Sequence, residues 1–206
     1  TKEEILKIEN VLKRNKWKVT SYMGTNGTEE SFLNMHGKSP RLLHLATHGF
    51  YYSPSKAEKV DYLKGYTDAM SLSGLVLAGG NAAWLGKQLP NGVLGGILTA
   101  NDIARLDLNN TDMAVLSACQ TGQGKATAEG LYGLQRAFKK AGVGTIVMSL
   151  WSVSDMATSE FMIAFYKCLA DKNNAWNKRK AFEQAKEIIR KKHPDPYHWA
   201  AFVMLD

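Results

Sequence analysis

The chain has 206 residues, of which 45% are hydrophobic and 22% are charged, and its formal net charge is +7. This length and composition predict one domain that buries a single core. The sequence has only 2 cysteines, which excludes a disulfide framework, and it has no apolar run typical of a signal peptide or a membrane span. We therefore expect reduced thiols, a cytoplasmic setting and no membrane partner.

Much of the basic excess lies in residues 172–193, where glutamates interrupt a run of lysines and arginines. No aromatic residue is interleaved there at a spacing suited to base stacking, and no known nucleic-acid-binding motif accompanies the run. We interpret the stretch as the solvated face of a helix and expect no direct nucleic acid partner.

The N-terminal part of the chain alternates helix-like and strand-like patterns. Ile5, Ile8 and Leu12 recur at helical spacing, with Thr1 before them as an N-cap. The expected elements are a helix over 2–14, a strand over 17–22, a short helix from Thr28 to about Met35 and a strand over 41–47.

Residues 51–100 are the least regular part of the chain. A polar segment is followed by two apolar runs, Leu72–Leu77 and Val93–Leu98, each near glycines. This pattern predicts a mobile loop and then a β-hairpin with a long connection, and a short helix begins at Asn101. The segment is either a plain linker or a gate for an active site.

The stretch DMAVLSACQTGQG (112–124) is the pattern around which the chain is organised. Met113–Leu116 is a short continuous apolar run, typical of a strand covered on both faces in a parallel sheet, and a helical pattern follows from Ala128 to Lys140. Cys119 is therefore expected at the carboxyl end of a strand, where open α/β sheets keep their ligands and chemistry. It is either a nucleophile there or a small buried core residue.

A base for such a nucleophile is available at His48. The apolar run RLLHLAT (41–47) ends just before it, and Gly49 follows, where the backbone can approach a substrate closely. If both runs are parallel strands, His48 and Cys119 meet at one edge of the sheet.

The remaining patterns complete an α/β fold. The expected elements are a strand over 145–151, a helix over 156–170, a helix over 175–192 and a last strand over 199–205. Alternating strands and helices predict a mostly parallel sheet with helices on both faces.

Four segments together resemble the CHAT domain, a caspase-like cysteine peptidase domain related to caspases and separases. They are HLATHG, LSACQTG, LQRAFKKAGVGTIVMSLWSVSD (134–155) and YHWAAFVMLD (197–206). The resemblance covers essentially residues 1–206 and implies a single caspase-like domain with an inserted β-hairpin. CHAT domains commonly follow tetratricopeptide repeats, and this chain begins at Thr1 without methionine. We therefore expect a C-terminal fragment of a longer protein, regulated by N-terminal helical repeats or by a partner protein.

The resemblance also implies an activity, that of a cysteine endopeptidase acting on a protein or peptide. Cys119 would attack as a thiolate, His48 would stabilise that thiolate and protonate the leaving amine, and the backbone N–H groups of Gly49 and Cys119 would form the oxyanion hole. The local caspase signature is met only in part, because Ser117 stands where glutamine is expected and Thr121 delays the glycine. The histidine and cysteine are 71 positions apart (119 − 48), against about 50 in caspases, which suggests an inserted segment.

Asp155 is the candidate for substrate specificity. WSVSD resembles the Trp-x-Val-x-Asp segment of separases, whose aspartate contributes to the pocket for a basic residue before the cut, so the resemblance implies cleavage after Arg or Lys. The alternative is that Asp155 is simply the N-cap of the helix over 156–170.

Other motifs fail in detail. The glycines after Cys119 do not match a phosphate-binding loop, because Ala126 and Thr127 stand where such motifs need other residues. His44 and His48 are four apart, but they lie in a strand pattern and do not form a helical zinc motif. We expect no metal and no cofactor. The competing hypotheses are a catalytically silent caspase-like scaffold for protein interaction and a small-molecule or nucleotide-binding module.

Overall fold

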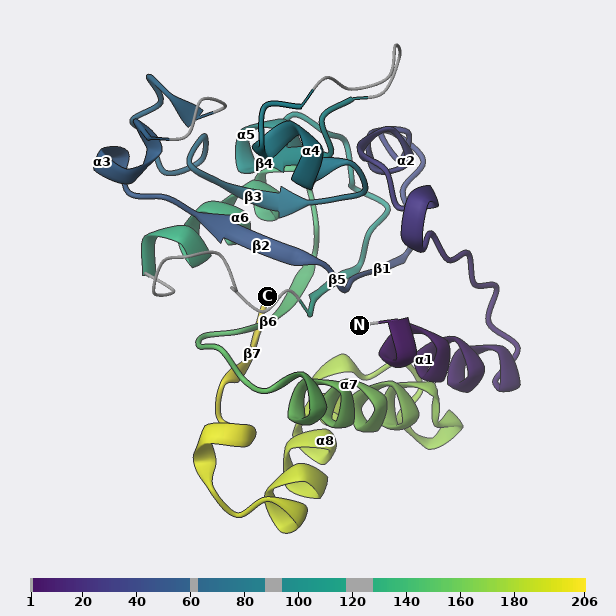
Figure 1. Cartoon of the computed structure of the whole chain (residues 1–206). Helices are drawn as coiled ribbons and strands as arrows, with labels where there is room; N and C mark the ends of the chain where they lie inside the picture. Colours follow the sequence, from purple (N-terminus) through teal and green to yellow (C-terminus); the bar gives the residue numbers. More distant parts are fainter. Residues whose placement is uncertain (1, 60–62, 88–93, 118–127) are drawn as a thin grey trace.

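The computed structural model describes residues 2–59, 63–87, 94–117 and 128–206 (Figure 1). A four-stranded sheet in the order β1-β5-β6-β7 forms its centre. Its strands are β1 (Leu42–Leu45), β5 (Met113–Leu116), β6 (Thr145–Ser149) and β7 (Phe202–Leu205). The pairs β1–β5 and β5–β6 are parallel and β6–β7 is antiparallel, so the expected mostly parallel sheet is confirmed.

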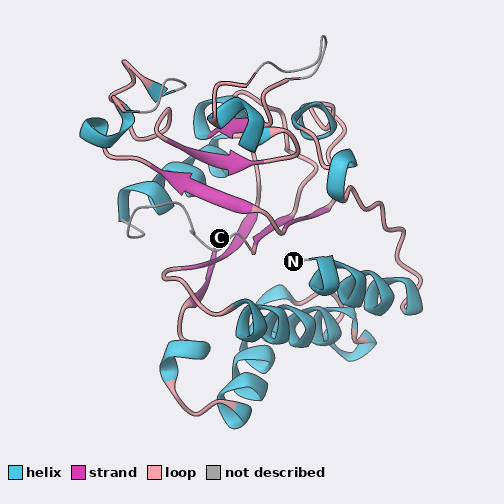
Figure 2. Cartoon of the chain, viewed as in Figure 1, coloured by secondary structure: helices cyan, strands magenta, loops and turns pink. Residues whose placement is uncertain are grey.

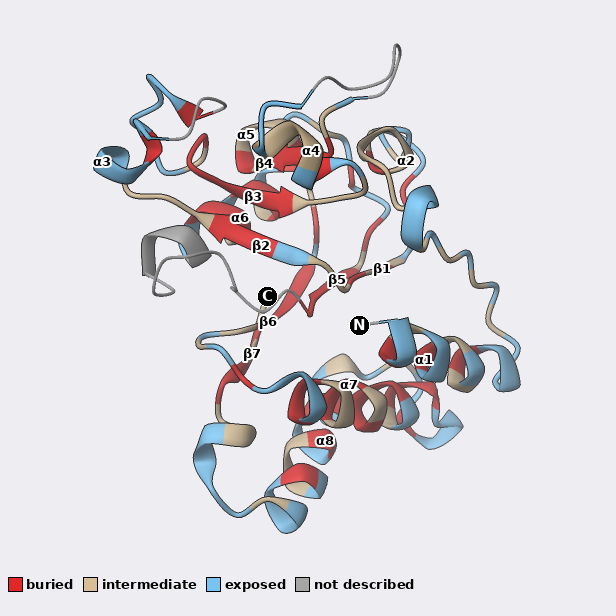
Figure 3. Ribbon diagram, in the orientation of Figure 1, coloured by how far each residue is buried: buried red, intermediate tan, exposed pale blue. Residues whose placement is uncertain are grey.

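Helices cover both faces of this sheet, and residues of β5 alternate between the two cores. Met113 and Val115 pack with one set of helices, whereas Ala114 and Leu116 pack with the other. The first set is α1 (Lys2–Arg14), α7 (Asp155–Ala170) and α8 (Lys178–Lys192), and the second is α2 (Glu29–Leu33), α5 (Ala100–Ala104) and α6 (Ala128–Lys140). Figures 1 and 3 show this layering and the burial of the strands between the helices. The continuous apolar run of β5 is therefore explained by burial on both sides.

A second sheet lies in the segment between β1 and β5 (Figure 2). It contains three antiparallel strands in the order β2-β3-β4, with bounds β2 (His48–Tyr51), β3 (Ser73–Val76) and β4 (Ile97–Thr99). The two runs expected to form a hairpin do contain β3 and β4. However, α4 (Gly80–Trp84) lies between them and β2 pairs with β3, so the element is a three-stranded sheet rather than a simple hairpin. Helix α3 (Pro54–Ala57) follows β2.

Helix α6 joins the two sheets through a close contact with β3. Gly133 of α6 is buried, and a Cβ atom built on it would lie 2.2 Å from Oγ of Ser73. Only glycine allows the helix to approach the strand this closely, so the second sheet is held against the helix that follows β5.

Several expected boundaries differ from those observed. Residues 17–22 were expected to form a strand, and their exposure does alternate, but they form none; Trp17 instead packs against Trp176, with ring centroids 5.1 Å apart. Helix α8 begins at Lys178, after the 3₁₀ turn η3 (Lys172–Asn174). The last strand begins only at Phe202, because the 3₁₀ turn η4 (Pro196–His198) precedes it, and a third such turn is η1 (Gly24–Asn26). Within the described ranges, no helix is long and apolar enough to cross a membrane.

Candidate active site

The carboxyl ends of β1 and β5 lie side by side at one edge of the central sheet. Leu45 and Leu116, the last residues of the two strands, are register partners, and the N–H of Ser117 donates to the carbonyl of Leu45 over 3.0 Å. His48 is the third residue after Leu45, and Cys119 is the third residue after Leu116. The two segments thus leave the sheet side by side, and each is followed within three residues by one member of the expected dyad.

His48 does not extend β1; it is the first residue of β2 in the second sheet. It is exposed, and its register partner is Val76 of β3. Directly before it, the hydroxyl of Thr47 donates to the carbonyl of Val76, which anchors the point where the chain passes from one sheet to the other. Gly49 is buried and pairs with Leu75.

Cys119 lies outside the described residues, as do the neighbouring glycines. The second cysteine, Cys168, is in α7 and is half-buried. Burial, together with the charge of Asp171, raises the pKa of the Cys168 thiol, which disfavours the reactive thiolate. Cys168 is therefore a poor substitute nucleophile.

Asp155 is exposed and is the first residue of α7. The expectation that it could be the N-cap of this helix is wrong, because that position is taken by Ser154, whose hydroxyl accepts from the N–H of Ala157. The segment from Ser149 to Asp155 leaves β6 at the same edge as the ends of β1 and β5, since the three strands are parallel. Capping of α7 therefore does not explain why an aspartate stands at position 155.

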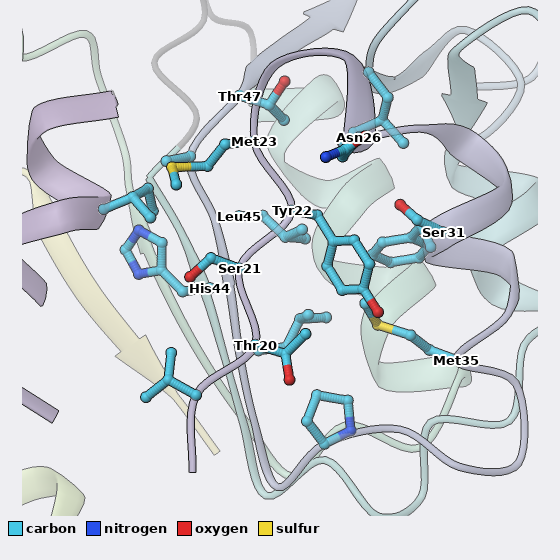
Figure 4. Close-up of a pocket in the computed structure, with 18 of the residues that line it drawn as sticks. Thr20, Ser21, Tyr22, Met23, Asn26, Ser31, Met35, His44, Leu45 and Thr47 are labelled. Carbon is cyan, nitrogen blue, oxygen red and sulfur yellow. The ribbon is translucent and has the colours of Figure 1, made fainter. Parts of the chain in front are cut away.

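A large groove of about 1790 Å³ runs along β1 and reaches Thr47 and His48 (Figure 4). In Figure 4, Leu45 of β1 and Tyr22 of the extended segment after α1 line the same hollow. The segment with Tyr22 lines this groove opposite β1 and forms no strand of its own.

A buried polar cluster, composed of Glu4, His44, Ser117 and Tyr166, lies under the strand ends. Nε2 of His44 is 3.2 Å from Oε1 of Glu4, Nδ1 of His44 is 2.8 Å from the hydroxyl of Tyr166, and the hydroxyl of Ser117 donates to Oε1 of Glu4 over 2.7 Å. The exposed fractions of Glu4, Ser117 and Tyr166 are only 3%, 6% and 0%.

The cluster stabilises an ionised carboxylate inside the protein. Burial opposes ionisation of Glu4, but the hydrogen bonds from His44 and from the hydroxyl of Ser117 outweigh it, so the pKa of Glu4 lies below its ordinary value. Burial raises the pKa of Tyr166 well above 10, so this phenol keeps its proton and can donate it to His44. Sequence reasoning missed the cluster, although Glu4 has the same helical spacing as Ile8 and Leu12 on the buried face of α1.

No metal centre is evident in the part of the chain that the structure describes, where no group of three or more His, Cys, Asp and Glu side chains could hold an ion.

The sequence is similar to a known domain family and to known proteins. A family model described as "CHAT domain" matches residues 1–206. Tetratricopeptide repeat protein 28 of Mus musculus is 33% identical over 111 residues, which is 53% of this chain and 4% of that protein. The protein of the same name from Homo sapiens is also 33% identical over 111 residues, again 53% of this chain and 4% of the relative. The chain thus corresponds to a small part of the length of these relatives.

Proposed function

Because the chain belongs to the CHAT domain family, a caspase-like group related to peptidases, we propose that it is a cysteine endopeptidase with His48 and Cys119 as its catalytic dyad. The observation that carries the proposal is the pairing of Leu45 with Leu116 at the ends of two neighbouring strands. His48 and Cys119 each follow three positions after one of these two residues. That two segments leave the same edge of the sheet, one before His48 and one before Cys119, supports a base and a nucleophile acting together there.

The reaction follows from the two side chains. The Cys119 thiolate adds to the scissile carbonyl carbon, and the resulting oxyanion is held by the backbone N–H groups of Gly49 and Cys119. The C–N bond breaks as His48 protonates the leaving amine, leaving a thioester. His48 then removes a proton from water, which attacks the thioester and releases the acid and the thiol.

Cleavage after a basic residue is the specificity we propose, with Asp155 as the acidic group that binds it. Asp155 is exposed beyond the carboxyl end of β6, and its side chain is not needed to cap α7. A carboxylate there would pair with Arg or Lys of the substrate by charge-assisted hydrogen bonds, each contributing about 1.5–3 kcal/mol.

The substrate is proposed to be a protein partner, and the activity of the chain is proposed to be regulated, by an increase above a basal level, by N-terminal helical repeats or by a regulatory protein. The similarity to a tetratricopeptide repeat protein supports this context. The same similarity supports the alternative function, a catalytically silent caspase-like scaffold for protein interaction.

A peptidyl acyloxymethyl ketone with arginine next to the reactive group separates these functions. We expect it to label Cys119 in the Cys168→Ser chain and to fail in both the Cys119→Ala and the His48→Ala variants. A free thiol outside an active site reacts poorly with this mild electrophile. Equal labelling with and without His48 would therefore favour the scaffold over the peptidase.

A further inference from the structure

The buried polar cluster connects four elements that are far apart in sequence. Glu4 lies on α1, His44 on β1, Tyr166 on α7, and Ser117 directly follows β5. The carboxylate of Glu4 is the common member, since both His44 and Ser117 bond to its Oε1 atom. Displacing α1 would remove the acceptor of both bonds at once.

The cluster can satisfy its hydrogen bonds in only a few ways. The carboxylate of Glu4 can only accept, so Nε2 of His44 donates to it, and in the neutral ring Nδ1 is then the acceptor for the hydroxyl of Tyr166. The hydroxyl of Ser117 is the second donor to the same carboxylate. Each polar hydrogen thus has one acceptor, and fully satisfied networks of this kind fix the positions of their members.

Ser117 is held from two sides. Its N–H donates to the carbonyl of Leu45 at the end of β1, and its hydroxyl donates to Glu4 from α1. It is also the last described residue before the segment with Cys119, two positions further along. The position of Ser117 at the end of β5 is therefore fixed by this double anchor.

We propose that Glu4 is a positioning residue for the peptidase: through Ser117 it fixes the carboxyl end of β5 and hence the point from which the chain reaches Cys119. The inference rests on the proposed function for its catalytic consequence, but the anchor itself consists only of described residues. It also gives α1 a role in activity, because the helix supplies the carboxylate.

The test combines amide hydrogen exchange at residue 117 with steady-state cleavage of an arginine-containing peptide by the whole chain. The variants are Glu4→Gln and Ser117→Ala, with Ser117→Thr as the conservative variant that keeps the hydroxyl. Ile8→Val is the matched control, because Ile8 is buried on the same face of α1 but belongs to the apolar core.

We expect faster exchange at residue 117 and a kcat about 10- to 100-fold lower in Glu4→Gln and Ser117→Ala, with little change in KM, since small misplacements of a reacting group have effects of this size. Ser117→Thr should recover much of the kcat, and Ile8→Val should keep it. Unchanged exchange in Ser117→Ala, which removes the donor to Glu4 entirely, would overturn the anchor. Faster exchange with unchanged kcat in an active chain would overturn its catalytic role. A parent chain with no peptidase activity overturns the proposed function and the positioning role with it, while the exchange data still show whether the anchor exists.

Discussion

The Glu4→Ala substitution tests most directly how much the buried cluster contributes to the free energy of unfolding. Glu4 is 3% exposed and accepts two hydrogen bonds, from His44 and Ser117. Hydrogen bonds to a charged group contribute about 1.5–3 kcal/mol each, but removing the carboxylate also relieves its desolvation cost. Two buried donors, Nε2 of His44 and the hydroxyl of Ser117, are left unpaired by the substitution. We therefore expect a loss near the lower end for broken buried charged pairs, about 3 kcal/mol.

The measurement is urea and thermal unfolding of the Glu4→Ala and Glu3→Ala variants. Glu3 is the adjacent residue of the same type, but its side chain is 79% exposed and only pairs with Lys7 within the helix. For a chain of this size, about 3 kcal/mol corresponds to a fall of about 6–12 °C in Tm. Glu3→Ala should leave the unfolding midpoint nearly unchanged. If the two variants unfold alike, the buried cluster does not stabilise the protein and the reasoning is wrong.

The same carboxylate gives the stability a defined pH dependence. The pKa of Glu4 is lower in the folded chain than its ordinary value of 4.5, so the unfolded chain binds this proton first as the pH falls. The stabilisation is present above about pH 4.5 and is lost as the pH falls through the folded-state pKa. Glu4→Gln, which cannot ionise, should show a correspondingly flatter loss of stability below that pH, and an identical slope in both chains would contradict the assignment.

Three further outcomes are expected. Cys119→Ala and His48→Ala should each abolish peptide cleavage without changing the unfolding midpoint, and full residual turnover in either variant would rule out the dyad. Asp155→Ala should reduce cleavage after Arg and Lys far more than alkylation of Cys119 by iodoacetamide, and a peptide-library preference for Asp would refute the basic specificity. Gly133→Ala should destabilise the chain by about 1–3 kcal/mol in urea unfolding, because its Cβ would overlap Oγ of Ser73 at 2.2 Å. The added Ser73→Ala change should recover part of that loss, and equal losses in both backgrounds would show that the overlap is not the cause.

The central sheet was predictable because its strands are buried on both faces. Residues such as Met113–Leu116 then form continuous apolar runs, and local chemistry such as the cap at Thr28, whose hydroxyl accepts from the N–H of Ser31, marks helix starts clearly. The prediction of a strand over 17–22 is wrong because an alternating pattern indicates only that the chain is extended. Trp17 and Val19 do face the core, yet alternation cannot reveal whether a neighbouring strand is present.

The candidate site was predictable in part for related reasons. An apolar run shows where a strand ends, but not that the next residues cross into another sheet, as Ala46 and Thr47 do before His48. Adjacent serine and aspartate are both good helix caps, so the choice of Ser154 over Asp155 depends on where the first turn begins. The role of Glu4 was not predicted, because the hydrogen-bond partners of this charged residue on an apolar helix face are distant in sequence.

The long segment between β1 and β5, which contains the second sheet, also affects the order in which the strands should form. Leu42 of β1 pairs with Met113 of β5, which is distant in sequence. Met113 in turn pairs with Thr145 of β6, and the sequence separation of this pair is about half as large. The pairs within the second sheet are also close in sequence. Each doubling of a closed loop costs about 0.6 kcal/mol in chain entropy, and non-local pairings form slowly. The β5-α6-β6 unit and the three-stranded sheet should therefore acquire amide protection early, and β1 should join its neighbour late. The strands that precede the proposed base and nucleophile thus come together through a non-local pairing, which should be among the last to form.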